Sequence, residues 1–214
     1  MEKKTDWTQY YNSPYKTASI TRKITGQILI KTIKKYIGNT KNLSLIELGG
    51  ANSAFLELLI NAFRPKEYII VDNNQAGLDK TKSRITKDNN VSVLNIDILK
   101  KDILKRGIQK QVDLVLSTGL IEHFDKTGTQ KVIKAHFELL KPKGIAVMTF
   151  PTPTILYKIT RYAAEVLGVW IFHDERPLLI KEVLKTAKIY GHIKEFKIIW
   201  PIFLTQGLVV FQKK

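Results

Sequence analysis

The 214-residue chain contains no cysteine. Disulfide bonds, thiolate zinc sites and cysteine nucleophiles are therefore excluded, and the cytoplasm is the expected compartment. The chain also lacks a run of about 18 uncharged apolar residues, which argues against a membrane span. The most apolar segment, 155–172, contains Lys158, Arg161 and Glu165, and the first residues lack the apolar core of a secretory signal.

Acidic residues are few compared with basic ones. The chain has 35 lysine and arginine residues against 19 aspartate and glutamate residues, which gives a formal net charge of +16. This charge suits RNA, an acidic lipid surface or a phosphorylated metabolite. It also fits a compositional bias, because lysine, isoleucine and asparagine are abundant while arginine is scarce. The lysines are scattered, so nucleic acid is the less expected partner.

Short apolar runs alternate with helical patterns along the chain. The runs that predict strands are 43–48, 68–71, 91–96, 112–116, 145–150, 193–200 and 206–212. Nearly continuous aliphatic strands with helices between them predict an α/β fold with a parallel sheet covered on both faces. The last two runs predict an antiparallel hairpin. We therefore expect one domain with a Rossmann-like, doubly wound sheet of about seven strands.

The domain divides into regions by its helical patterns and by a change of sequence pattern after residue 150. Helices are expected at 17–37, 53–63, 75–85, 127–140 and 178–190, and the helix at 53–63 would be capped by Asn52 or Ser53. The expected regions are an N-terminal helical cap (1–40), a ligand-binding core (43–150), a substrate-lid insertion (151–177) and a C-terminal helix with strands (178–214).

Acidic residues stand at the ends of three successive predicted strands. Ligands bind beyond the carboxyl ends of the strands in an open parallel sheet. Glu47 ends the first strand and is followed by Gly49 and Gly50, whose backbones can turn sharply or lie against a ligand. Asp72 ends the second strand and can accept hydrogen bonds from ribose hydroxyls. Asp97 follows the third strand at the same 25-residue step and can accept from an exocyclic amine.

The fourth strand ends in Ser117-Thr118-Gly119, with Ile121-Glu122-His123-Phe124 shortly after it. Together with the three acids and the glycine turn, this pattern resembles the small-molecule branch of the class I S-adenosylmethionine-dependent methyltransferases, over residues 43–150. The resemblance implies S-adenosylmethionine as cofactor and S-adenosylhomocysteine as product. The implied cofactor contacts are Glu47, Gly49, Gly50, Ala51 and Ser53 for the methionine end, Asp72 and Asn73 for the ribose, Asp97 and Ile98 for the adenine, and Ser117 and Thr118 near the sulfonium.

The glycine loop departs from the usual pattern of this family. Ala51 and Ser53 stand where glycines are common. The small side chains are expected to preserve the backbone path, but the departure puts the cofactor affinity in question. It also leaves open a non-catalytic protein that retains the fold. A dinucleotide dehydrogenase is excluded, because the loop cannot supply G-x-G-x-x-G.

Methyl transfer from a sulfonium is an in-line displacement that depends mainly on positioning. His123 is the candidate general base, with orientation of the following loop as its structural alternative. Tyr15 is expected to shield the sulfonium by a cation–π contact, unless the N-terminal aromatic residues only hold that segment down.

The acceptor is expected to contact the 151–177 insertion. Its candidate substrate residues are Tyr157, Arg161, His173 and Arg176, and core packing of the apolar residues there is the alternative. No metal site is expected, because only Glu122 and Asp125 follow the fourth strand as acidic ligands.

The leading hypothesis is methylation of a small-molecule, lipid-linked or sugar-linked acceptor. It includes peripheral contact with an anionic membrane, suggested by the basic N-terminal helix and the apolar segment after Phe150. RNA methylation is the alternative that the net charge suggests.

Overall fold

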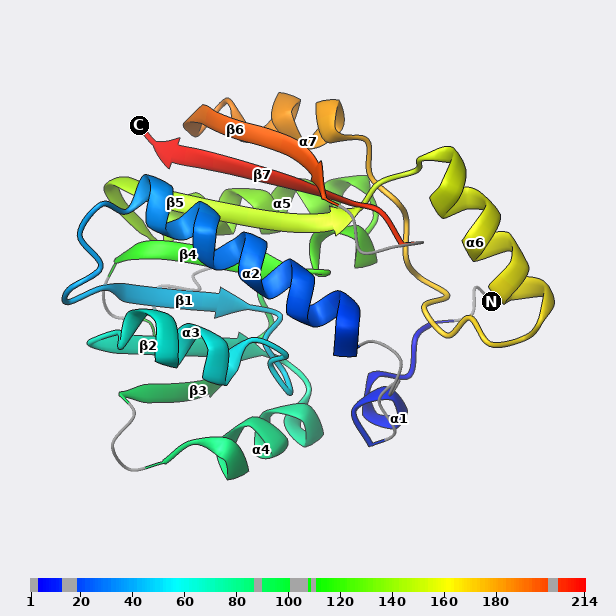
Figure 1. Ribbon diagram of the computed structural model, residues 1–214, viewed down its shortest axis with the longest axis horizontal. Coiled ribbons are helices and arrows are strands. Elements are labelled where there is room, and N and C mark those ends of the chain that lie inside the picture. Colours follow the sequence, from blue (N-terminus) through cyan, green and yellow to red (C-terminus); the bar gives the residue numbers. More distant parts are fainter. Residues whose placement is uncertain (1–3, 13–18, 87–89, 101–107, 109–110, 200–203) are drawn as a thin grey trace.

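The protein, described here from a computed structural model, forms a single seven-stranded sheet in the order β3-β2-β1-β4-β5-β7-β6 (Figure 1). The structure describes residues 4–12, 19–86, 90–100, 108, 111–199 and 204–214. The strands are β1 (Ser44–Leu48), β2 (Glu67–Asp72), β3 (Val91–Asn95), β4 (Val112–Thr118), β5 (Leu140–Pro151), β6 (Gly191–Ile199) and β7 (Gln206–Lys213). The helices are α1 (Trp7–Asn12), α2 (Ser19–Tyr36), α3 (Leu56–Phe63), α4 (Gln75–Arg84), the short 3₁₀ helix η3 (Ile121–His123), α5 (Lys126–Glu138), α6 (Ile155–Val166) and α7 (Ile180–Ala187).

The strand pairing confirms the predicted doubly wound sheet. β1 pairs in parallel with β2 and with β4, β2 pairs in parallel with β3, and β4 pairs in parallel with β5. β7 runs antiparallel between β5 and β6, so the late hairpin is added to the sheet as expected. Because the chain builds outward from β1 in one direction and then returns to place β4 on its other side, the strand order reverses between β1 and β4.

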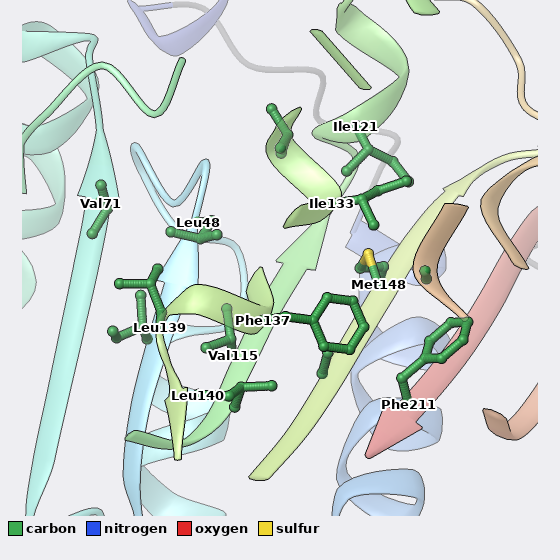
Figure 2. Close-up of a cluster of buried hydrophobic side chains, with 14 of the residues drawn as sticks. Leu48, Val71, Val115, Ile121, Ile133, Phe137, Leu139, Leu140, Met148 and Phe211 are labelled. Carbon is green, nitrogen blue, oxygen red and sulfur yellow. The ribbon is translucent and has the colours of Figure 1, made fainter. Parts of the chain in front are cut away.

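Apolar clusters cover both faces of this sheet. On one face, Phe137 of α5 packs against Phe211 of β7 with ring centroids 5.9 Å apart, close to Met148 of β5 (Figure 2). On the other face, α2 contributes the fully buried side chains of Leu29 and Ile33. The central strands are thus buried on both sides, which explains their nearly continuous aliphatic sequences.

The predicted cap of the first core helix is wrong. Helix α3 begins at Leu56, and Phe55 occupies its N-cap without a side-chain hydrogen bond. Ser53 Oγ instead donates to a carboxylate oxygen of Glu47 at 2.8 Å. The same serine oxygen accepts from the backbone N–H of Phe55 at 3.3 Å, so the Ser53 hydroxyl bonds within the loop before the helix and not to the first turn of α3.

The connection into β5 also differs from the expected turn. Helix α5 ends at Glu138 and β5 begins at Leu140, so the Lys-Pro-Lys-Gly sequence at 141–144 lies within the strand's span. The pairing with β4 shifts there, from Val112 opposite Leu140 to Leu114 opposite Ile145. The proline and glycine therefore produce an irregularity in the ladder, as a bulge does.

Two segments lie beyond the carboxyl ends of the central strands (Figure 1). One is α1, which packs against α4, and the other is α6, which follows β5. Across the described ranges, no helix is both long and apolar enough to cross a membrane.

Candidate active site

A cavity of about 260 Å³ opens where the strand order reverses. Its walls come from the loop after β1, the end of β4 with η3, helix α1, the start of α2 and the segment after β5. The predicted site residues that line it are Glu47, Gly49, Ala51, Ser53, Thr118, His123 and Tyr157. The fold therefore brings the first and fourth strand ends together at one cavity, as the sequence predicts.

Glu47 is the buried centre of the loop after β1. Its side chain is 2% exposed, and one carboxylate oxygen accepts hydrogen bonds from Ser53 Oγ at 2.8 Å and from the Tyr68 hydroxyl. Burial raises the pKa of Glu47, and the hydrogen bonds from Tyr68 and Ser53 oppose that rise. The carboxylate thus ties the far end of the loop to β2, and it fixes the path of the backbone between Gly49 and Ser53.

The two glycines of this loop are required by its geometry. Gly49 has a φ of 72°, which is unfavourable for residues with a side chain. A Cβ atom on Gly50 would lie 2.7 Å from Cγ2 of Ile70. Both backbone N–H groups donate to the carbonyl oxygen of Val71, at 2.8 and 3.3 Å. The bare backbone turns tightly over the end of β2 and leaves one side of the loop open to the cavity.

The alanine and serine that depart from the family's glycines each have a structural partner. Ala51 donates its backbone N–H to Asp72 Oδ2 at 3.1 Å, and its side chain is only 5% exposed. Ser53 supplies the hydroxyl that binds Glu47. Of the two, only Ser53 adds a hydrogen bond that glycine could not make, because the donor of Ala51 is its backbone N–H.

Asp72, the acid at the end of β2, lies next to the loop and does not reach the cavity wall. Its carboxylate accepts from the backbone N–H groups of Ala51 at 3.1 Å and Asn74 at 2.8 Å. Burial raises the pKa of Asp72, and these backbone hydrogen bonds lower it in part. Asn73 beside it is exposed. Their predicted contacts with ribose stay predictions.

Asp97 and Ile98 follow β3 at the neighbouring strand end. The backbone N–H of Ile96 donates to the carbonyl oxygen of Asp72 at 2.8 Å, which holds the two strand ends together. Asp97 accepts from the backbone N–H of Leu99 at 3.0 Å and is partly exposed. Ile98 packs against the core cluster and is also partly exposed. Their predicted adenine contacts are untested.

Ser117 and Thr118 separate at the end of β4. Thr118 lines the cavity, whereas Ser117 is fully buried and bonded to Nε2 of His136 at 2.9 Å. His136 also donates from Nδ1 to the carbonyl oxygen of Val132 at 2.8 Å, so its Nε2 accepts the serine proton. Burial lowers the pKa of His136 to about 4, and the imidazole is neutral. The Ser117 side chain faces this core hydrogen bond and not the cavity.

His123, the predicted base, lies at the cavity wall on the side opposite the glycine loop. Its Nδ1 lies 3.1 Å from Asp174 Oδ1, and its Nε2 lies 3.9 Å from Glu122 Oε1. Burial lowers the pKa of His123, but the hydrogen bond to Asp174 and the charges of nearby acids outweigh it and raise the pKa. The aspartate holds the ring with Nε2 on the side of Glu122, and the neighbouring acids favour the charged form of the ring.

Glu122 and Glu175 also line the cavity, and neither was predicted to contact the substrate. Glu122 is 1% exposed, and within the described part of the chain its Oε2 has no hydrogen-bond partner. Burial raises the pKa of Glu122 to about 8, with a further rise from Glu175 and an opposing effect of His123. Glu122, His123 and Glu175 each have one potential ligand atom within 4.8 Å of the other two. The sequence analysis expected no metal site and did not predict this group.

The 151–177 segment contributes one of its four predicted substrate residues to the cavity. Tyr157 lines it and donates its hydroxyl to Glu175. Arg161 lies behind, with Nη1 2.9 Å from the Glu175 carbonyl oxygen and its guanidinium over the Trp170 ring. The other two predicted residues lie outside the cavity wall: His173 is exposed, and Arg176 pairs with Glu182 at 3.0 Å.

Aromatic side chains enclose the cavity next to His123. Trp7 of α1 meets the His123 ring edge-on at 4.7 Å and lies 5.9 Å from Phe172. Tyr10 and Tyr11 of α1 also line the cavity, and Tyr15 lies outside the described residues. The sequence placed N-terminal tyrosines near the ligand. Phe172 belongs to the 151–177 insertion that was expected to contact the acceptor, but it was not among the residues singled out there.

The fold is an α/β sheet with a cavity at the β1–β4 switch point, and comparisons with known proteins show what the chain resembles. Residues 46–146 match the model of a family described as a methyltransferase domain. Over these residues, just under half of the chain, the sequence is similar to a methyltransferase domain, and the fold is one that solved methyltransferases share. No curated protein sequence matches the chain.

Solved structures share the fold at low sequence identity. Magnesium protoporphyrin IX methyltransferase from Synechocystis PCC 6803, with bound S-adenosylhomocysteine, is 10% identical with a TM-score of 0.72, and the match covers 91% of this chain and 84% of that one. The N-methyltransferase NodS from Bradyrhizobium japonicum WM9, also with bound S-adenosylhomocysteine, is 16% identical with a TM-score of 0.65, and the match covers 99% and 93%. An S-adenosylmethionine-dependent methyltransferase from Clostridium acetobutylicum ATCC 824 is 15% identical with a TM-score of 0.65, covering 88% and 90%.

Proposed function

We propose that the protein transfers a methyl group from S-adenosylmethionine to a small-molecule or lipid- or sugar-linked acceptor. The cofactor would lie along the loop after β1, where bare glycine backbone borders the cavity. The acceptor would lie opposite, against η3 and the 151–177 segment. The observation that carries the proposal is this two-sided cavity at the point where the strand order reverses.

The cofactor supplies a methyl group on a sulfonium that is already an activated leaving group. The protein's own part is therefore to align the two reactants and exclude water. The Glu47 network holds the loop rigid, and the rings of Trp7 and Phe172 close the cavity near His123. Nε2 of His123 would take a proton from an acceptor that arrives protonated, with Asp174 stabilising the charged ring.

Titration of the protein with S-adenosylhomocysteine by calorimetry tests the cofactor half of the proposal. We expect one site per chain and weaker binding by Asp72→Ala. Absence of binding in the wild-type protein would overturn the proposal. A crystal structure with S-adenosylhomocysteine bound would then locate the acceptor space beside its sulfur, and a cofactor found away from the loop after β1 would contradict the assignment of the two sides.

A membrane-linked acceptor is favoured by an apolar stripe on α6. Ile155, Ile159, Tyr162 and Val166 recur at helical spacing, and each is between 61% and 80% exposed. The helix lies beyond the carboxyl ends of the strands (Figure 1), and its Tyr157 lines the cavity. The net charge of +16 complements anionic lipid headgroups. We propose that this stripe rests on an anionic membrane while the cavity receives a lipid-linked acceptor.

Vesicle flotation tests the membrane contact. The wild-type protein should float with phosphatidylglycerol vesicles more than with phosphatidylcholine vesicles, and Ile159→Glu should lower the bound fraction. Ile189→Glu is the matched control, because Ile189 is also 61% exposed but lies between α7 and β6. Equal flotation with both lipids, or equal losses in both variants, would contradict the membrane proposal.

A further inference from the structure

The acceptor side of the cavity is acidic although the whole chain is strongly basic. Glu122, Asp174 and Glu175 surround His123, while the formal net charge of the chain is +16. This contrast bears on the acceptor and rests on the proposed function, because it takes the loop after β1 as the cofactor side. An acidic wall favours a cationic acceptor over an anionic one. Burial raises the pKa of Glu122 to about 8, and a cation beside it would lower that pKa and favour the carboxylate form.

Most of these carboxylates already have a partner. Asp174 is bonded to His123, and Glu175 accepts the Tyr157 hydroxyl with the Arg161 guanidinium 3.7 Å away. Glu122 differs, because its Oε2 is buried and has no hydrogen-bond partner among the described residues. An unpaired buried carboxylate is costly, so its oxygen is suited to a donor brought by a ligand.

Aromatic rings form another part of the cavity wall, whose one described arginine, Arg22, is bonded to the Tyr10 hydroxyl at 3.1 Å. Trp7 lies edge-on to His123 at 4.7 Å, Phe172 lies 5.9 Å from Trp7, and Trp170 lies 5.8 Å from Phe172. All three rings line the cavity. Aromatic faces attract organic cations through their quadrupoles, and they are poor surroundings for an anion.

From this geometry we infer that the acceptor is an organic amine that enters as its ammonium ion, held by Glu122 within the aromatic wall and methylated on nitrogen. An ammonium N–H donates to Glu122 Oε2, and the carbon skeleton packs on the rings of Trp7 and Phe172. For this acceptor Glu122, in place of His123, is then the residue that binds the ammonium group and takes its proton, and the His123 ring stays bonded to Asp174.

The proton and electron pairs balance in this step. The ammonium nitrogen gives one proton to the Glu122 carboxylate and recovers its lone pair. That pair forms the new N–C bond to the methyl carbon as the S–C bond breaks, and the electrons of the S–C bond stay on sulfur as a neutral thioether. The product leaves as an N-methylammonium ion, and Glu122 returns its proton to water.

A divalent metal ion is the competing occupant, since ligand atoms of Glu122, His123 and Glu175 lie within 4.8 Å of one another. Two features favour the organic cation. Glu175 already accepts the Tyr157 hydroxyl near the positive charge of Arg161, which opposes a second cation on that oxygen. The aromatic rings of Trp7 and Phe172 provide no oxygen ligands for a hard ion.

Binding of simple probes to the protein saturated with S-adenosylhomocysteine tests the inference. Benzylammonium, benzyl alcohol and benzoate share a ring and differ in charge. We expect benzylammonium to bind at least about 10-fold more tightly than benzyl alcohol, because only the ammonium group makes a charge-assisted hydrogen bond with Glu122. Benzoate should not bind. The variant Glu122→Gln should abolish the preference without changing the affinity for S-adenosylhomocysteine.

Glu138→Gln is the control, because it removes the same charge from the exposed end of α5. A second variant, Trp7→Leu, should lower benzylammonium affinity several-fold while leaving Glu122 in place. If S-adenosylhomocysteine does not bind, the proposed function fails. If it binds but benzyl alcohol or benzoate matches benzylammonium, or if Mn²⁺ binds in a Glu122-dependent way and excludes benzylammonium, the amine inference is overturned.

Discussion

Glu47 and Glu122 are buried carboxylates on the two sides of one cavity, yet their surroundings differ. Glu47, at the end of β1, accepts from Ser53 and Tyr68 and holds the loop that would carry the cofactor. Glu122, in η3 after β4, has a buried oxygen without a partner in the described structure. A buried acid whose acceptors are filled by the protein stabilises the fold, and one whose acceptor is left open is available to a ligand.

The largest expected effect is on stability. Glu47→Ala should lower the free energy of unfolding by about 3 kcal/mol, because it leaves the buried hydroxyls of Ser53 and Tyr68 without their acceptor. Glu122→Ala should cost less than about 1 kcal/mol, since it strands no donor and removes an unpartnered carboxylate. Urea denaturation of both variants measures the difference. Equal losses would break the comparison between the two acids.

His136 is a second buried titratable group whose hydrogen bonds are all made within the protein, as those of Glu47 are. Its folded pKa of about 4 lies below the ordinary value of 6.5. The unfolded chain therefore binds more protons between these values, and stability is present above pH 6.5 and lost as the pH falls toward 4. The loss should reach about 3 kcal/mol. Denaturation of the wild-type protein and His136→Gln across this range measures it, and the same slope in both would exclude His136 as the cause.

Asp72→Ala should weaken S-adenosylhomocysteine binding about 10- to 100-fold, because it removes the predicted ribose acceptor and the support of the Ala51 N–H. Asp79→Ala on the exposed side of α4 is the control for charge. Calorimetry on both variants gives the affinities. Loss of binding in the control as well would show that the net charge, and not this carboxylate, governs affinity.

The smallest expected effect concerns the departure from glycine at position 53. Ser53→Ala should lower the free energy of unfolding by about 1 kcal/mol, because Glu47 loses one hydrogen bond. Ser83→Ala removes an exposed hydroxyl that bonds only to the carbonyl of Lys80 and should have little effect. An unchanged stability in Ser53→Ala would mean that the serine is a neutral replacement.

The sheet could be predicted from the sequence because buried parallel strands leave continuous apolar runs. The runs at 43–48 and 112–116 became β1 and β4, and Glu47, the acid at the end of the first strand, lies at the cavity as expected. The start of α3 was mispredicted because Ser53 looks like an N-cap in sequence, whereas its hydroxyl is taken by Glu47, six residues earlier. A local capping pattern carries no information about a buried acid nearby.

The acceptor side was only partly predictable, because its members come from distant parts of the chain. His123 could be chosen by its position after the fourth strand. Its partner Asp174 lies 51 residues further on, and Trp7 lies far before it. The charged run at 173–176 drew attention to His173 and Arg176, but the fold turns Glu175 into the cavity and leaves those two outside. Side-chain direction in an irregular segment follows from packing that sequence spacing does not encode.

The position of α1 implies that access to the cavity depends on local unfolding. This helix has only six residues, too few to be stable alone, and it is held partly by the Tyr11 ring packed close to Gly77 of α4. Its opening should therefore cost much less than unfolding the sheet. A ligand in the cavity would hold Trp7 and Tyr10 in place. Proteolytic cleavage and amide exchange in α1 should therefore slow when ligand is bound, and the rate of either process reports whether the cavity is occupied.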